Sequence, residues 1–385
     1  MTKKTKVVYV LSMLSYGGTE GFVINVIKRL NLNKYDVSVI LALEAKETQF
    51  CDRADELEQM GIKMYYVGKP NKNKLGFRSF CKRLRTCLVL NGPFDIIHSN
   101  MDFFNGVVLT VARKTHIPKR VAHAHISSSQ TELCASFVKK VIIKIYRFIM
   151  RKMILFSATD LCGCSNEANL FEYGKKKFKD AKCIYNGISL EKYKKTIRSK
   201  SYMQDEFGVN KKYVILTVGR VANMKNPWFM VETMYQLSKL RNDFMFLWVG
   251  HNAYLESFKK AVQEKEITEH FIFAGTRNDI AEIMKNSDLF ILPSIFEGLG
   301  IVLIEAQASG LHCLVSDKVP QLADCGNCEF LDIDDSDAAK KWAIRISEVL
   351  ENNINYLGDE KRMQNFDIDY TIKQLTKIYG ETGER

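Results

Sequence analysis

The hydrophobic positions of this chain fall into short apolar runs that alternate with stretches of helical spacing. Short continuous apolar runs are typical of strands buried on both faces, and apolar residues recurring every three or four positions are typical of helices packed on one side. The predicted strands are residues 6–11, 37–43, 63–67, 95–99, 120–125, 161–164 and 184–188 in the first half, and 213–218, 244–249, 271–273, 288–292 and 311–316 in the second. This alternation predicts an α/β fold with parallel sheets wound on both faces, in which ligands bind beyond the carboxyl ends of the strands.

A polar, strongly basic stretch at residues 192–200 has no apolar period and interrupts the alternation. A chain of 385 residues is also too long for one ordinary core. We therefore predict a first domain over residues 1–190, a linker over 191–211 and a second domain over 212–365. Residues 366–385 are predicted to contain a C-terminal helix, for which packing back on the first domain is one option.

The composition is that of an ordinary globular protein, with 46% hydrophobic residues. No run of about 18 apolar residues predicts a membrane-spanning helix, and the start lacks the features of a signal peptide, so we expect a cytoplasmic location. The ten cysteines are scattered, and the pairs Cys162-x-Cys164 and Cys325-x2-Cys328 each lack a second ligand pair. Reduced thiols are therefore favoured over a zinc site.

The net charge of +12 is unevenly distributed. Residues 1–200 carry 36 basic against 16 acidic side chains, whereas residues 201–385 carry 20 against 28. This asymmetry predicts that the first half meets a polyanion, for which nucleic acid, an acidic membrane surface and a phosphorylated acceptor are the candidates.

One helical stretch, residues 137–156, contains no acidic residue and separates its side chains into two stripes. The apolar stripe consists of Val138, Val141, Ile142, Ile145, Ile149 and Met153, and the basic stripe consists of Lys140, Lys144, Arg147 and Arg151. Such a helix is typical of a membrane-surface element. The alternative is a domain helix whose apolar stripe packs on the sheet while its cations face water.

The strongest candidate for chemistry is the segment 289–305, which reads as a strand, a glycine-bearing turn and a helix. A helix that starts after Gly300 would direct unpaired N–H groups at a phosphate. Glu297 lies in the turn, and Glu305 lies about two helical turns deeper on nearly the same side. This order suits a nucleotide-sugar, with sugar hydroxyls, diphosphate and ribose hydroxyls in sequence. The alternative is a surface helix with two solvated glutamates.

Two further strand ends carry candidate binding residues. Gly17 and Gly18 follow the first strand in a Rossmann-like position that lacks the G-x-G-x-x-G fingerprint, and they would permit close backbone approach unless this is an ordinary turn. Arg220 and Lys225 flank another strand-to-helix loop, where paired cations can clamp a diphosphate if they are not simply a solvated pair.

His125 ends a predicted strand and shares its face with His123. A contact to substrate, a structural role and a metal site are the three interpretations. A metal pair would need a third ligand, and the sequence offers no obvious one.

Together these segments resemble family 4 retaining glycosyltransferases of GT-B architecture, in particular bacterial capsule and exopolysaccharide transferases. The resemblance covers nearly the whole chain. The matching segments are Gly17-Gly18-Thr19-Glu20, Ala122-His123-Ala124-His125, Asn186-Gly187-Ile188, Gly219-Arg220 with Lys225, Gly275-x-Arg277-x-Asp279, and Glu297-x7-Glu305 followed by Ala306 and Gly310. It implies two Rossmann-like domains that face each other across a cleft.

The resemblance also implies roles for single residues. Arg220 and Lys225 would bind the donor diphosphate, Glu305 the ribose hydroxyls, and Glu297 the transferred sugar, while His125 would contact the sugar near the acceptor. The remaining donor-binding residues would be Gly17, Gly18, Gly298, Leu299, Gly300, Ile301 and Val302. The chain departs from the family at Gly300, where proline is frequent, and at His251, where an acidic residue is common.

The predicted function is transfer of a sugar, with a UDP-sugar favoured, to a lipid-linked or oligosaccharide acceptor at the inner face of the cell membrane. No cofactor or metal is expected, and no D-x-D pair stands at a strand end. The alternatives are a GT-B-type nucleotide-sugar epimerase and a non-catalytic donor-binding partner subunit. A nucleic-acid binder is not favoured because basic strands interleaved with aromatic residues are missing.

Overall fold

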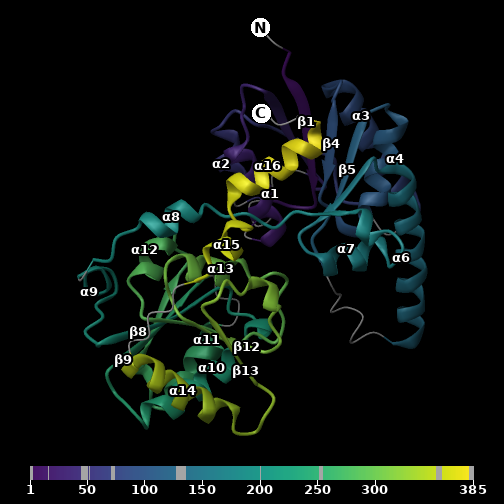
Figure 1. Cartoon of the computed structure of the whole chain (residues 1–385). Helices are drawn as coiled ribbons and strands as arrows, with labels where there is room; N and C mark the ends of the chain where they lie inside the picture. Colours follow the sequence, from purple (N-terminus) through teal and green to yellow (C-terminus); the bar gives the residue numbers. More distant parts are fainter. Residues whose placement is uncertain are drawn as a thin grey trace. The chain divides into compact units, whose positions relative to one another are not determined.

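The computed structural model in Figure 1 describes residues 3–15, 17–44, 51, 53–70, 74–126, 136–199, 201–250, 255–352 and 358–380. The chain divides into two compact units. Unit 1 comprises Met1–Gly187 together with Ile368–Arg385, and unit 2 comprises Ile188–Asp367. Both units are α/β and contain parallel sheets, which confirms the fold class predicted from the alternating apolar runs.

Unit 1 is built on a seven-stranded sheet in the order β3-β2-β1-β4-β5-β6-β7. Its strands are β1 (Thr5–Leu11), β2 (Tyr35–Leu41), β3 (Lys63–Tyr66), β4 (Ile96–Ser99), β5 (Lys119–Ala124), β6 (Asp160–Gly163) and β7 (Lys182–Cys183). Its helices are α1 (Gly18–Arg29), α2 (Ala54–Glu58), α3 (Lys74–Asn91), α4 (Asn105–Lys114), α6 (Phe137–Ser157), α7 (Asn166–Tyr173) and α16 (Ile368–Tyr379).

The two faces of this sheet bury separate cores because successive side chains of a strand point to opposite faces. Val7 and Tyr9 of β1 belong to the core beneath α1 and α16. Val8 and Val10 belong to the core beneath α3, α4 and α6. The apolar run of β1 is therefore continuous, as a strand covered on both faces requires.

The helix α16 returns to unit 1 from the far end of the chain (Figure 1). The hydroxyl of Tyr379 lies 2.6 Å from that of Tyr9, and the Thr371 hydroxyl donates a hydrogen bond of 3.1 Å to the carbonyl of Tyr185. Arg29 and Asp369 form an ion pair at the surface. Polar and apolar contacts thus fix α16 beside α1.

Unit 2 is built on a six-stranded sheet in the order β10-β9-β8-β11-β12-β13. Its strands are β8 (Tyr213–Val218), β9 (Phe244–Val249), β10 (Phe271–Gly275), β11 (Leu289–Leu292), β12 (Cys313–Ser316) and β13 (Cys328–Leu331). Its helices are α8 (Leu190–Lys195), α9 (Tyr202–Phe207), α10 (Pro227–Ser238), α11 (Leu255–Glu264), α12 (Ile280–Lys285), α13 (Ile301–Ala308), α14 (Ala338–Asn352) and α15 (Glu360–Gln364).

Residues 191–211, expected to form a linker, contain α9 and most of α8 and are attached to unit 2. The Tyr202 hydroxyl donates a hydrogen bond of 2.6 Å to Asp279, and the Ser199 N–H donates one of 2.8 Å to Asn286.

Among the helices that the structure describes, none is long and apolar enough to cross a membrane.

Candidate functional site

The candidate site lies at the carboxyl ends of two neighbouring strands of unit 2. Strands β8 and β11 pair in parallel, so the loops that follow them leave the same edge of the sheet. The Ile295 N–H in the second loop donates a hydrogen bond of 2.8 Å to the carbonyl of Met224 in the first loop. Residues from separate parts of the sequence are thereby brought together.

An ion pair between these two loops forms the centre of the site. The Lys225 ammonium lies 2.5 Å from Oε1 of Glu297, and the Ser294 hydroxyl donates a hydrogen bond of 2.7 Å to the same oxygen. Only 14% of the Lys225 side chain and 12% of the Glu297 side chain are exposed. Because water screens such a pair weakly, each charge strongly fixes the position of the other.

Arg220 supplies a second cation in the loop that follows β8 and also contains Lys225. It is exposed and makes no hydrogen bond or ion pair with the residues that the structure describes. The preceding Gly219 has φ +147°, and a Cβ on it would lie 2.9 Å from Cε of Lys225. Its carbonyl accepts a hydrogen bond of 2.8 Å from the Trp248 indole. Glycine at position 219 therefore allows Lys225 to fold back against the end of the strand.

The helix α13 begins at the same edge without a side-chain cap. Gly300 has φ +76° and ψ +50°, a left-handed conformation that the proline frequent at this position in the family cannot adopt. Within the described part of the chain, the N–H groups of Leu299, Gly300, Ile301 and Val302 donate no hydrogen bond. These donors and the positive end of the helix dipole suit an anion.

Glu305 lies further along α13 and is half-buried. Its Oε1 accepts a hydrogen bond of 2.7 Å from the Tyr193 hydroxyl on α8. Burial raises the pKa of the Glu305 carboxyl, although the Tyr193 hydrogen bond acts in the opposite direction. The sequence interpretation missed Tyr193 because it lies beside the basic stretch, yet Leu190 and Tyr193 show the three-residue spacing of a buried helical face.

In unit 1, the two glycines expected near the donor begin α1. Gly17 is the extended residue before the helix, which has no side-chain cap, and Gly18 is its first residue. A Cβ on Gly18 would meet no atom within 4 Å, whereas a Cβ on Gly17 would clash with Oε2 of Glu20, so the Glu20 carboxylate folds over the first of the two glycines.

His125 follows β5 and is held by hydrogen bonds on two sides. Its backbone N–H donates to Asp102 at 3.0 Å, and its Nε2 lies 2.9 Å from Oδ1 of Asn100. Since the Asn100 amide donates to the His98 carbonyl at 3.2 Å, its Oδ1 serves as the acceptor for Nε2–H of His125. Nδ1 of His125 is then an acceptor that has no partner among the described residues. Burial lowers the pKa of His125 to about 3, so the ring is neutral.

Residues 199–366, which include every residue of the unit 2 site except Tyr193, match the family model of glycosyl transferases group 1. This stretch is a group 1 glycosyltransferase domain. The capsular polysaccharide biosynthesis glycosyltransferase CapH of Staphylococcus aureus is 26% identical over 382 residues, which cover 97% of this chain and 98% of CapH. An Escherichia coli UDP-Gal:α-D-GlcNAc-diphosphoundecaprenol α-1,3-galactosyltransferase is 28% identical over 209 residues, which cover 51% of this chain and 53% of that protein.

The fold also matches that of solved structures. Anabaena HepE in complex with UDP superimposes with a TM-score of 0.78 at 17% identity, covering 97% of this chain and 99% of HepE. This likeness confirms the predicted GT-B fold, in which the glycosyltransferase domain is the second of two α/β units.

Outside the glycosyltransferase domain, α6 turns part of its basic stripe toward the rest of unit 1. Arg147 lies 4.6 Å from the ring centroid of Phe171, and Arg151 donates hydrogen bonds of 2.7 and 2.8 Å to the carbonyls of Phe171 and Glu172. Lys140 is half-buried and Lys144 is exposed. The expectation of one water-facing basic stripe is therefore corrected, because two of its four cations pack against unit 1.

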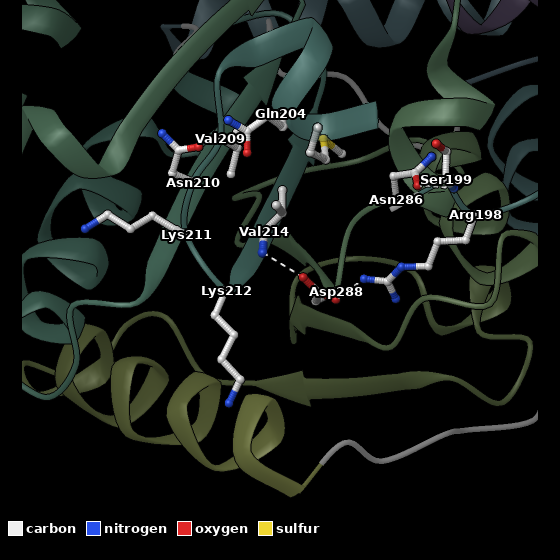
Figure 2. Close-up of a pocket in the computed structure, with 11 residues that line it drawn as sticks. Arg198, Ser199, Gln204, Val209, Asn210, Lys211, Lys212, Val214, Asn286 and Asp288 are labelled. Atoms are coloured by element: carbon white, nitrogen blue, oxygen red, sulfur yellow. Dashed lines mark hydrogen bonds and ion pairs between the residues drawn. The ribbon is translucent and has the colours of Figure 1, made fainter. Parts of the chain in front are cut away.

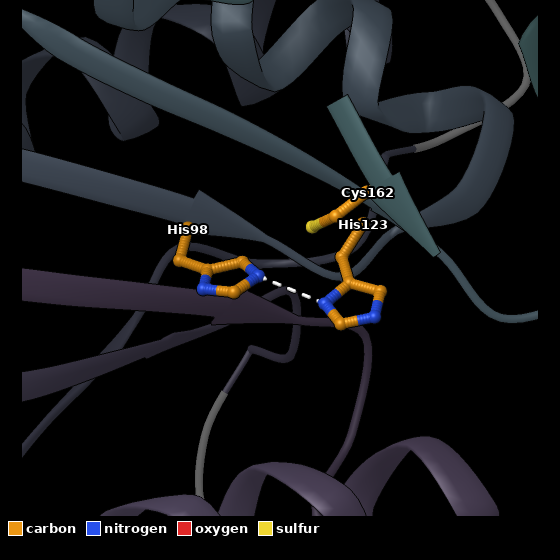
Figure 3. Close-up of side chains that lie close together, drawn as sticks. All are labelled: His98, His123 and Cys162. Carbon is orange, nitrogen blue, oxygen red and sulfur yellow. Dashed lines mark hydrogen bonds between the residues drawn. The ribbon is translucent and has the colours of Figure 1, made fainter. Parts of the chain in front are cut away.

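Three buried side chains on neighbouring strands of unit 1 lie close together in Figure 3. His98, His123 and Cys162 place one potential ligand atom each within 4.8 Å of one another, a donor set that suits a soft divalent cation. The Nε2 atom of His98 already lies 3.0 Å from Nδ1 of His123, and the Nδ1 atom of His98 lies 2.7 Å from the Tyr379 hydroxyl.

The electrostatics of this cluster favour its neutral forms. Burial lowers the pKa of both histidines and raises the pKa of the Cys162 thiol. A metal ion would have to displace the hydrogen bond between the two rings and remove the thiol proton. The sequence interpretation missed the group because His98 and Cys162 are brought to His123 only by the strand order β4-β5-β6.

Figure 2 shows a cavity of about 330 Å³ at the opposite edge of the unit 2 sheet. It lies beside the amino ends of β8 and β11, where the Asp288 carboxylate accepts hydrogen bonds from Arg198 at 2.6 Å and from the Val214 N–H at 2.8 Å. None of the predicted donor-binding residues lines it. The Asp288 carboxylate in this cavity is thus engaged with Arg198 and with the start of β8.

Proposed function

We propose that this chain transfers a sugar from a nucleotide-diphosphate-sugar to a lipid-linked or oligosaccharide acceptor in surface polysaccharide biosynthesis, with retained stereochemistry. The observation that carries the proposal is that the loops after the neighbouring strands β8 and β11 hold the Lys225–Glu297 pair and the exposed Arg220. The capsular role of CapH, the UDP bound to HepE and the diphosphoundecaprenol substrate named for the E. coli relative support the donor and acceptor classes. A UDP-hexose is the favoured donor.

The proposed chemistry follows from where charge develops. The acceptor hydroxyl attacks the anomeric carbon, the bond from that carbon to the diphosphate oxygen breaks, and the hydroxyl proton passes to the departing phosphate. Arg220, Lys225 and the amides at the start of α13 would stabilise the diphosphate, and preorganised donors of this kind contribute about 10² to 10³ each in rate. These fixed positive groups would act without a metal ion.

The other residues would orient the donor. Glu297 would hold Lys225 in place and contact the transferred sugar. Glu305 would accept hydrogen bonds from the ribose hydroxyls while Tyr193 fixes the carboxylate. His125 would contact the sugar near the acceptor, and the hydrogen bond between its Nε2 and Asn100 would fix the orientation of its ring.

The experiment pairs donor binding with turnover. A panel of nucleotides is screened for thermal stabilisation, since a ligand at 100 times its dissociation constant adds about 2.7 kcal/mol to stability. The stabilising donor is then incubated with an undecaprenyl-diphosphate-sugar acceptor, and the anomeric configuration of the product is determined by NMR. An α-linked product from an α-configured donor is expected, and an inverted product would contradict the retaining mechanism.

The same reaction mixtures distinguish the alternatives. Conversion of the nucleotide-sugar without an acceptor would indicate an epimerase. Stabilisation by UDP with no turnover on any acceptor would favour a donor-binding partner subunit.

A further inference from the structure

The outward face of α6 is an apolar surface of unusual extent. Nine of the twenty exposed large hydrophobic side chains among the described residues belong to this one helix. They are Phe137, Val138, Val141, Ile142, Ile145, Tyr146, Phe148, Ile149 and Phe156. Single exposed apolar residues are ordinary on a protein surface, but a contiguous patch of this kind marks an interaction site.

This patch is separate from the face that packs on unit 1. Met150, Ile154 and Ser157 are buried against the unit, and Arg147 and Arg151 lie on the same inward side. At 100° per residue, the exposed hydrophobic residues other than Tyr146 occupy the opposite side of the helix, and Tyr146 lies at the border between the two faces. The inward face supplies the buried side chains of α6, and of the outward residues Phe156 also packs under the Arg113 guanidinium of α4.

The charged side chains of α6 itself are all of one sign. Residues 137–157 include no acidic residue, and Lys139, Lys144 and Lys152 are exposed. Two copies of this chain that met through the patch would bring these cations together at an apolar contact, which is unfavourable. An anionic lipid surface would accept the apolar side chains and neutralise the cations at the same time.

We propose that α6 lies in the headgroup region of an anionic bilayer, with its outward apolar face inserted and its exposed lysines beside the lipid phosphates. This inference rests on the proposed function and deepens it, because α6 would be the surface at which the enzyme reaches a lipid-linked acceptor. Vesicle binding is measured without donor or acceptor, so the two proposals can fail separately.

The test is flotation of the full chain with vesicles of phosphatidylcholine, with and without phosphatidylglycerol. We expect binding to the vesicles that contain phosphatidylglycerol, and an I145E/F148E variant should bind them at least about tenfold more weakly. The matched control is V89E/L90E, which places the same two charges on exposed positions of α3 and should bind like the unchanged chain. All four positions are exposed, so circular dichroism and the melting temperature should remain unchanged.

A separate variant tests the electrostatic part. K139Q/K144Q/K152Q should lose most of its preference for phosphatidylglycerol while keeping the apolar face. Absence of binding to anionic vesicles, or wild-type binding by I145E/F148E, would overturn the proposal. So would sedimentation of the lipid-free chain as a dimer that I145E/F148E converts to a monomer, because a second copy would then be the occupant.

Discussion

Replacing Lys225 with alanine tests two roles of this side chain. Its role in holding the loops together is measured by stability, and its role in stabilising the leaving phosphate is measured by activity. The side chain is only 14% exposed and lies 2.5 Å from Glu297, so its removal leaves a largely buried carboxylate without its cation. Losing one partner of a buried pair costs about 3–5 kcal/mol, and the remaining exposure together with the Ser294 hydrogen bond reduces this to about 1–3 kcal/mol. The loss of one preorganised charge should reduce kcat/KM for the donor by about 10² to 10³.

The assay is a double-mutant cycle with E297Q. Urea unfolding and initial rates are measured for K225A, E297Q and the double variant. The stability losses should be less than additive, with a coupling of about 1–3 kcal/mol, because E297Q removes the charge that K225A leaves unpaired. Lys259, an exposed lysine that pairs with Glu256 on α11, provides the control, and K259A should change neither quantity. Additive stability losses, or K225A activity within tenfold of the unchanged chain, would refute the reasoning.

Three further predictions concern single side chains. Y193F should raise the donor KM and destabilise the chain by about 1 kcal/mol. The Tyr193 hydrogen bond opposes the raised pKa of Glu305, so its loss should raise that pKa further and move the acid limb of the pH–rate profile to higher pH. An unmoved acid limb would exclude this coupling. G300A should lower stability by about 1–2 kcal/mol in thermal unfolding, because Gly300 has φ +76°, and an unchanged melting temperature would show that the turn relaxes. Burial raises the pKa of Glu172 well above its ordinary value, so the folded chain retains a proton that the unfolded chain releases as the pH rises above about 4.5. The free energy of unfolding should therefore fall towards alkaline pH. E172Q should reduce this difference in urea unfolding at pH 5 and pH 8, and an equal pH dependence of the two chains would contradict the assignment.

The sequence was most informative where the required residues are close together in the chain. The turn, Gly300 and the start of α13 form one continuous segment, so apolar spacing and a single glycine were enough to locate them. The contact between Lys225 and Glu297 spans 72 residues and depends on β11 lying beside β8. The sheet order places β9 and β10 on the other side of β8, and the apolar runs carry no information about that order.

The orientation of α6 shows a different limit. Its two stripes were visible in the sequence, and the usual rule places the apolar stripe inside. The structure instead uses the aliphatic stems and planar heads of Arg147 and Arg151 as packing surfaces, with carbonyls of α7 as acceptors. The acceptors and rings that make this favourable come from another helix, so periodicity along α6 could not reveal them.

The position of α16 has a consequence for how the chain is made. Unit 1 is discontinuous in sequence, and unit 2 is inserted between Gly187 and Ile368. During synthesis, the face of the first sheet that α16 covers stays uncovered until the whole of unit 2 has left the ribosome. Until then the hydroxyl of Tyr9 and the ring of His98 lack their hydrogen-bond partner Tyr379. Unit 2 can meanwhile fold on its own continuous segment, so the half of the chain translated first is the half completed last.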